Sequence, residues 1–152
     1  MADVGKLERL RTHVVSLLST FGFSSFKPEL IQISEETYLP TREGFDLGFD
    51  TSASDGIRII WSYLIGLFQV ANEYNTNHPK ILIFDEPRQQ EAKKVSFTAL
   101  LKSASTLGTG KGQIILATSE DEVALVAALE GSPHTLYSFP AEDGKILPEF
   151  NP

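Results

Sequence analysis

The sequence predicts an α/β fold in which parallel strands alternate with helices. Two short runs dominated by Ile, Leu and Phe, at residues 80–84 and Gln113–Ala117, have the character of strands. A weaker third strand is expected at residues 135–139. Because strands and helices alternate from residue 80 onward, the strands are expected to be parallel and joined by right-handed crossovers. Four consecutive apolar residues in the first run predict a strand buried on both faces.

The other elements follow from the spacing of apolar residues. Helices are expected where apolar residues recur every three or four positions, at residues 6–21, 54–73, 90–105 and 121–130. Residues 30–34 and 45–49 alternate apolar and polar side chains, which predicts two paired antiparallel strands joined through a turn at residues 40–44. One unit is expected over residues 1–140, with an irregular tail at residues 141–152.

Composition and charge narrow the classes of function. The chain has 152 residues, enough for one domain with a core, and a net charge of −7, which disfavours binding to nucleic acid by bulk electrostatics. It has no cysteine, which excludes disulfides and zinc–thiolate sites. No apolar run reaches the roughly 20 residues of a membrane span, and the N-terminus does not resemble a signal peptide. A cytoplasmic location without membrane contact is therefore expected.

The first candidate site is the acidic pair Asp85 and Glu86, directly after the first apolar strand. In an open α/β sheet, ligands bind just outside the carboxyl ends of the strands. Pro87 follows the pair and ends strand pairing, because proline lacks an N–H group. One of the two carboxylates is expected to hold Mg²⁺ through water, and the other to orient or deprotonate an attacking water.

Two further candidate sites contain small and hydroxyl-bearing residues. The first, Ser52-Ala53-Ser54-Asp55, stands at the start of a long apolar helix, where exposed N–H groups favour an anion such as a phosphate. An ordinary helix N-cap remains the alternative there. The second is Ser119, which follows the strand Gln113–Ala117. Its hydroxyl can bond to a phosphate or to water, or it can cap the next helix.

These segments resemble parts of ABC-type ATPases of the class that includes SMC, RecF and RecN-like DNA-repair proteins. Residues 80–87 are similar to the Walker B motif, and residues 52–55 to the signature motif, with Ala53 and Ser54 in place of two glycines. Ser119 stands where this family usually has a switch histidine. The Leu-Asp pair that commonly follows Walker B is missing.

The resemblance implies the C-terminal half of a P-loop NTPase domain. The glycine-rich stretch at residues 108–112 does not supply Walker A, because its spacing is wrong and it follows a helix and precedes a strand. ATP and Mg²⁺ are therefore expected only in an assembly with a Walker A-bearing polypeptide or a second ATPase subunit. Self-association is the other expectation, and DNA is expected to be contacted only indirectly.

The resemblance also implies roles for the candidate residues in that assembly. Asp85 would hold Mg²⁺, Glu86 would be the catalytic base, and the remaining candidates would contact nucleotide: Ser52, Ala53, Ser54, Asp55 and Ser119. The chain alone is expected to hydrolyse little or no ATP.

Two other interpretations remain open. The departures at Ala53, Ser54 and Ser119 favour a non-catalytic interaction or regulatory module derived from such an ATPase, whereas the intact Asp85-Glu86 pair argues against it. An unrelated small α/β enzyme that uses the same two carboxylates with a metal is the third interpretation.

Overall fold

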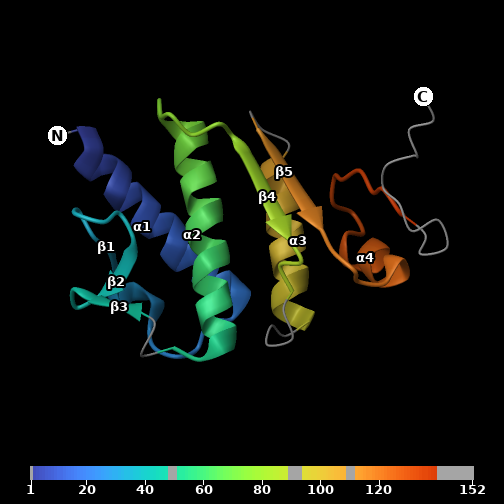
Figure 1. Ribbon diagram of the computed structural model, residues 1–152, viewed down its shortest axis with the longest axis horizontal. Helices are drawn as coiled ribbons and strands as arrows, with labels where there is room; N and C mark the ends of the chain where they lie inside the picture. Colours follow the sequence, from blue (N-terminus) through green and yellow to red (C-terminus); the bar gives the residue numbers. More distant parts are fainter. Residues whose placement is uncertain (1, 48–50, 89–93, 109–111, 140–152) are drawn as a thin grey trace, which may run out of the picture.

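The computed structural model describes residues 2–47, 51–88, 94–108 and 112–139 (Figure 1). This part of the chain is a mixed α/β structure with four α-helices, one 3-10 helix and two small sheets. None of its helices is long and apolar enough to cross a membrane. The expected tail at residues 141–152 lies outside the described residues. The elements, in chain order, are α1 (Ala2–Phe21), η1 (Pro28–Leu30), β1 (Ile31–Ile33), β2 (Pro40–Arg42), β3 (Phe45–Asp46), α2 (Ala53–Glu73), β4 (Ile81–Asp85), α3 (Lys94–Gly108), β5 (Gln113–Ala117) and α4 (Glu122–Ala128).

Helices α1 and α2 lie side by side at the centre of the molecule. They contact closely because α2 carries Gly66 at the crossing, where an added Cβ would lie 3.1 Å from Leu10 Cδ1 and 3.3 Å from Val14 Cγ2. The first sheet lies on one side of this pair, and α3 with the second sheet lies on the other (Figure 1). Each side has its own apolar core, because both helices bury apolar residues in two directions.

The first sheet differs from the expected pairing of residues 30–34 with residues 45–49. β1 pairs with β2 and β2 pairs with β3, all antiparallel, so the order is β1-β2-β3. The segment expected as a turn therefore contains a strand. The tight turn is Glu43-Gly44, whose φ values of 54° and 81° fit a two-residue hairpin loop. Pro40 is compatible with β2 because it is the first residue of the strand.

The second sheet consists of β4 and β5, which are parallel as expected. Their register runs from Ile81 opposite Gln113 to Asp85 opposite Ala117. α3 lies behind this sheet in Figure 1 and packs on Leu82 and Phe84.

The prediction that the first of these strands is buried on both faces is wrong. The side chains of β4 alternate between exposed and buried, because no element of the described residues covers the second face. That face presents Ile81, Ile83 and Ile115, which are 49%, 63% and 41% exposed.

The expected third strand at residues 135–139 is also absent from the structure. After α4 the chain turns at Gly131 and runs on without regular secondary structure. Hydrogen bonds from side chains, not a strand ladder, connect it to the helices: Ser105 Oγ donates to Pro133 O at 2.5 Å, and Ser138 Oγ donates to Glu122 Oε2 at 2.7 Å. Its strand-like composition is therefore not sufficient to place it at the edge of β5.

Candidate functional site

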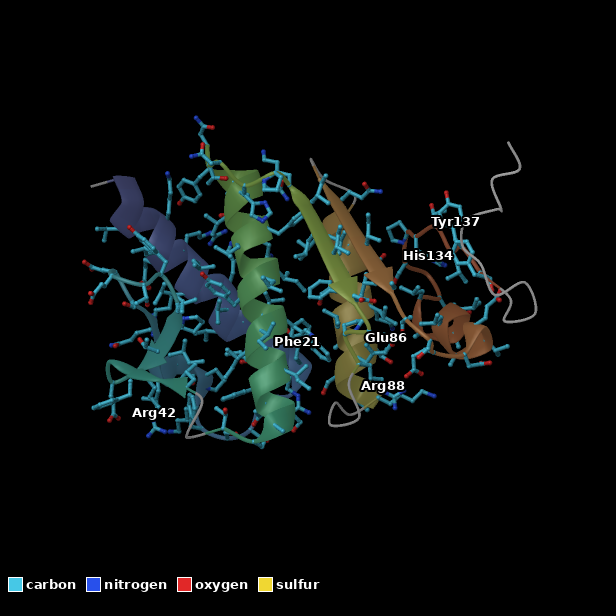
Figure 2. The ribbon with its side chains drawn as sticks, in the orientation of Figure 1. Phe21, Arg42, Glu86, Arg88, His134 and Tyr137 are labelled. Atoms are coloured by element: carbon cyan, nitrogen blue, oxygen red, sulfur yellow. The ribbon has the colours of Figure 1, made fainter. Side chains whose placement is uncertain are left out.

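The acidic pair lies at the carboxyl end of the parallel sheet. Asp85 is the last residue of β4. Glu86 continues the ladder by one step, because its N–H donates to Ala117 O at 2.9 Å. Both residues are exposed. In Figure 2, Glu86 lies where β4 ends, with Arg88 beside it. The pair thus occupies the position where ligands bind in open α/β sheets.

The backbone leaves strand geometry at Glu86. Its φ is 42°, in the left-handed region that residues other than glycine enter at a cost in conformational energy. Pro87, the next residue, is buried, so the chain turns inward immediately after the exposed carboxylates. Strained residues of this kind cluster at active sites and ligand clamps. Tyr38, Glu43 and Lys80 also have positive φ values, so the conformation of Glu86 does not by itself distinguish the acidic pair.

An ion pair joins the segments that follow the two strands. Arg88, after β4, is hydrogen-bonded through Nη1 to Glu120 Oε1, after β5. The N–H of Glu120 donates to Thr118 Oγ1 at 3.3 Å, which helps to fix the Glu120 backbone. The two side chains are 30% and 23% exposed, so the pair is partly shielded from water. It brings one positive and one negative charge close to the end of the sheet and adds no net charge there.

Ser119 lies in this second segment and is exposed. Of the two roles that the sequence left open for it, the structure assigns the helix cap to another residue. Asp121 is the N-cap of α4, and its Oδ1 accepts the N–H of Ala124 at 3.0 Å. The hydroxyl of Ser119 therefore remains a candidate for contact with a phosphate or water.

The segment 52–55 begins α2 through an N-cap. Ser52 Oγ accepts the N–H of Asp55 at 3.2 Å and lies 3.2 Å from Ser54 Oγ. The N–H of Ser52 donates to Ser25 Oγ at 3.2 Å. Ala53 is exposed and begins the helix. Ser52, Ala53 and Ser54 thus form an accessible helix start, with Ser52 as the N-cap.

Asp55, in contrast, is turned into the protein and is 1% exposed. Its Oδ2 accepts the N–H groups of Ser24 at 3.1 Å and Ser25 at 2.7 Å and the hydroxyl of Ser25 at 2.6 Å. Its Oδ1 forms an ion pair with Arg58. Burial opposes ionisation, but the hydrogen bonds from Ser25 and Arg58 outweigh it and lower the pKa of Asp55. Both oxygens are therefore occupied by internal partners.

Arg58 extends this network to α3. The guanidinium is 3% exposed, and its Nε and Nη2 donate to Ser96 Oγ at 3.2 and 3.0 Å. Ser96 lies in the first turn of α3, the helix that follows the acidic pair in the chain. In Figure 1, α2 and α3 begin at the lower end of the molecule, toward which β4 and β5 run. The Asp55–Arg58–Ser96 network thus joins the start of α2 to the start of α3.

The donors at the sheet end fit Mg²⁺ only in part. Mg²⁺ in nucleotide sites is commonly held by one or two carboxylates together with water and substrate phosphates. The exposed Asp85 can supply one such oxygen. No group of three or more His, Asp or Glu side chains that could hold a metal is found within the described ranges. A magnesium ion at Asp85 would therefore need further oxygens from a nucleotide, from water or from another polypeptide.

The glycine-rich stretch before β5 includes Gly112, which is required for packing. An added Cβ there would lie 2.5 Å from Lys80 O and 2.7 Å from Phe68 Cζ. Residues 109–111 are outside the described part of the chain. The close approach of Lys80 and Phe68 explains why a glycine stands at position 112. This packing role agrees with the interpretation that the stretch is not a Walker A loop.

Sequence reasoning missed the partners of the candidate residues. The spacing of Asp55 and Arg58, three residues apart on one helix, is a local signal for an ion pair. Ser25 and Ser96 gave no such signal, because they lie 30 and 38 residues from the side chains they contact. The Arg88–Glu120 pair spans 32 residues and depends on the parallel register of β4 and β5.

Comparisons of the chain with protein-family models, with curated proteins and with solved structures found no match.

Proposed function

We propose that this chain is the C-terminal portion of an SMC/RecF-like ABC ATPase, with Walker B and signature elements that act together with a Walker A-bearing part. The observation that carries the proposal is the exposed Asp85-Glu86 pair at the carboxyl end of a parallel strand. The accessible helix start at Ser52 and Ser54 provides a second group suited to a phosphate.

The proposed chemistry is hydrolysis of ATP in the assembled state. Bound magnesium would neutralise charge on the triphosphate, with Asp85 as one of its anchors. Glu86 would accept the proton of the water that attacks the terminal phosphorus, so that ADP leaves with the electron pair of the broken P–O bond. Ser52, Ser54 and Ser119 would donate hydrogen bonds to phosphate oxygens. Asp55, with both oxygens engaged internally, would hold the signature segment in place rather than contact the nucleotide.

The open face of the β4–β5 sheet supports the idea of a missing part. Parallel sheets are normally covered on both faces, and in this one Ile81, Ile83 and Ile115 remain exposed. A polypeptide that carries the phosphate-binding loop would cover this face as it completes the fold. The proposed partner is therefore that Walker A-bearing polypeptide or subunit, and any DNA would be reached only through the assembly.

Calorimetric titration with Mg-ATP tests the proposal at its first step. The chain alone should show no binding tighter than about micromolar, because a triphosphate needs a backbone cradle and a lysine. Coexpression with a Walker A-bearing polypeptide encoded beside it should restore nucleotide binding and turnover. Tight binding by the isolated chain, or an assembly without ATPase activity, would contradict the proposal.

The second candidate function is a non-catalytic interaction or regulatory module derived from such an ATPase. The inward orientation of Asp55 favours it, since one residue of the signature-like segment is committed to internal contacts. In this case the partner would bind the same open sheet face, and substitution of Glu86 would leave the activity of the assembly unchanged. The effect of Glu86→Gln on the ATP turnover of the assembly separates the two functions.

A further inference from the structure

A groove of about 710 Å³ is lined by residues of α1, η1 and the first sheet. These elements lie on the opposite side of α2 from the end of β4 (Figure 1). Apolar residues from both sides line it, Val4 and Leu7 from α1 and Leu30 and Ile33 from η1 and β1. Val4 is 59% exposed and Leu30 is 45% exposed. The groove therefore has apolar surface in contact with water, as docking sites for other molecules have.

The charges around this groove are unequal. Glu8, Glu29, Glu35 and Glu43 line it together with one cationic side chain, Arg11. Arg42 lies outside the lining, but its Nε is 3.9 Å from Glu43 Oε1, so four carboxylates face two guanidinium groups and the local net charge is −2. The side chains of Glu8 and Glu43 are 67% and 73% exposed, so they are accessible to a ligand. We call this hollow the acidic groove.

Arg11, the cation in the lining of the groove, is committed to the fold. Arg11 Nε donates to Ile31 O and Nη2 donates to Glu29 O, both at 2.8 Å, and Nη1 contacts Glu8 Oε1 at 3.2 Å. These bonds tie α1 to η1 and β1. Arg11 therefore has a structural task, and the excess charge that the acidic groove offers to a ligand is negative.

We propose that the acidic groove binds a short amphipathic segment of a partner protein, rich in lysine or arginine. Apolar side chains at helical spacing would cover Val4, Leu7, Leu30 and Ile33, as in other helix-in-groove complexes. The flanking cations would face the glutamates. The charge of −7 on the whole chain would further speed encounter with a cationic segment.

Fluorescence anisotropy with synthetic peptides tests this proposal. The probe is a labelled helical peptide of Leu and Lys with one apolar face, and its controls are a Leu–Glu peptide with the same spacing and a Lys–Ser peptide without the apolar face. We expect saturable binding of the Leu–Lys peptide, with affinity at least about tenfold higher than for either control. Equal binding of the Lys–Ser peptide, or no saturable binding of the probe, would overturn the proposal.

Matched variants separate the acidic groove from general attraction to an acidic protein. Glu35→Gln with Glu43→Gln removes two charges at the groove, and Glu122→Gln with Glu130→Gln removes two charges on and after α4. The double variant in the groove should lower the affinity for the Leu–Lys peptide by roughly fivefold or more, and the double variant at α4 by less than about twofold. Equal weakening by both pairs would show that the binding is not located in the groove.

The apolar contribution is tested in the same assay. Leu30→Ser should also lower the affinity for the Leu–Lys peptide by roughly fivefold, since it removes apolar surface from the groove. Val123→Ser, at an exposed position of α4, is the matched control and should leave the affinity unchanged. Circular dichroism melts of each variant confirm that the fold is retained. A Leu30→Ser variant that is folded and binds normally would contradict an apolar floor for the site.

Discussion

Replacement of Asp55 by alanine should be among the most destabilising single changes in this chain. The substitution removes the acceptor of three hydrogen bonds from Ser24 and Ser25 and leaves Arg58, 3% exposed, without its counter-ion. Breaking a buried ion pair by removal of one partner costs about 3–5 kcal/mol. Because domains of this size have an unfolding free energy of about 5–15 kcal/mol, the Asp55→Ala variant should lose a large part of its stability.

Urea denaturation followed by tryptophan fluorescence measures this loss directly. Trp61 is the single tryptophan in the chain, is 2% exposed and makes an edge-to-face contact with Phe21. The matched control is Asp121→Ala, which removes an exposed N-cap and should cost only about 0.5–2 kcal/mol. A cost below about 1 kcal/mol for Asp55→Ala would refute the argument that this network holds α2 in place.

Two further measurements separate the ion pair from the hydrogen bonds. The double variant Asp55→Ala/Arg58→Met should lose less unfolding free energy than the two single variants added together, by about 0.5–3 kcal/mol, because it leaves no buried charge unpaired. The pKa of Asp55 is lowered in the fold, so its stabilisation is present above the unfolded pKa and is lost as pH falls through the folded pKa. The difference between the parent and Asp55→Asn should therefore shrink in acid.

Three other predictions concern catalysis, pH and packing. In an assembly that hydrolyses ATP, Glu86→Gln should lower turnover about 10²- to 10⁴-fold with nucleotide binding retained, and a loss of less than about threefold would exclude it as the base. Burial lowers the pKa of His13, whose Nε2 lies 3.0 Å from Glu73 Oε1. The free energy of unfolding, measured by melts, should therefore fall as pH drops below the ordinary histidine range, and a His13→Gln variant should lack this slope. Gly112→Ala should destabilise the fold by about 1–3 kcal/mol because its Cβ has no room, whereas Gly5→Ala, in open space on α1, should stabilise it by about 0.5–1 kcal/mol.

The sequence predicted well those elements whose pattern is local. The helices around residues 6–21 and 54–73 and the strand Gln113–Ala117 were confirmed, since each has an apolar periodicity of its own. The placement of Asp85 and Glu86 at a strand end was also predictable, because an apolar run, two acids and a proline occur in direct succession.

The features that the sequence did not reveal depend on contacts between distant segments. Whether β4 is covered on one face or two depends on which helices reach it, and its apolar run is the same in both cases. The hairpin was misplaced because the Glu43-Gly44 turn lacks the stronger Asn-Gly signal. Asp is a residue type that is common at helix N-termini, so the sequence does not show which way Asp55 faces. Its hydrogen bond with Ser25 shows that it faces inward.

The proposed partner of the open β4–β5 face would affect the amount of this protein in a cell. A partner that binds the folded chain but not the unfolded chain adds a stability that grows with the logarithm of its own free concentration. Without such a partner, the exposed Ile81, Ile83 and Ile115 beside strand edges are also a surface for non-specific pairing. The level of intact chain would then follow the level of its partner, with excess copies removed by proteolysis or aggregation. The ratio of chain to partner would then be set after synthesis, because copies with an uncovered sheet face would be lost.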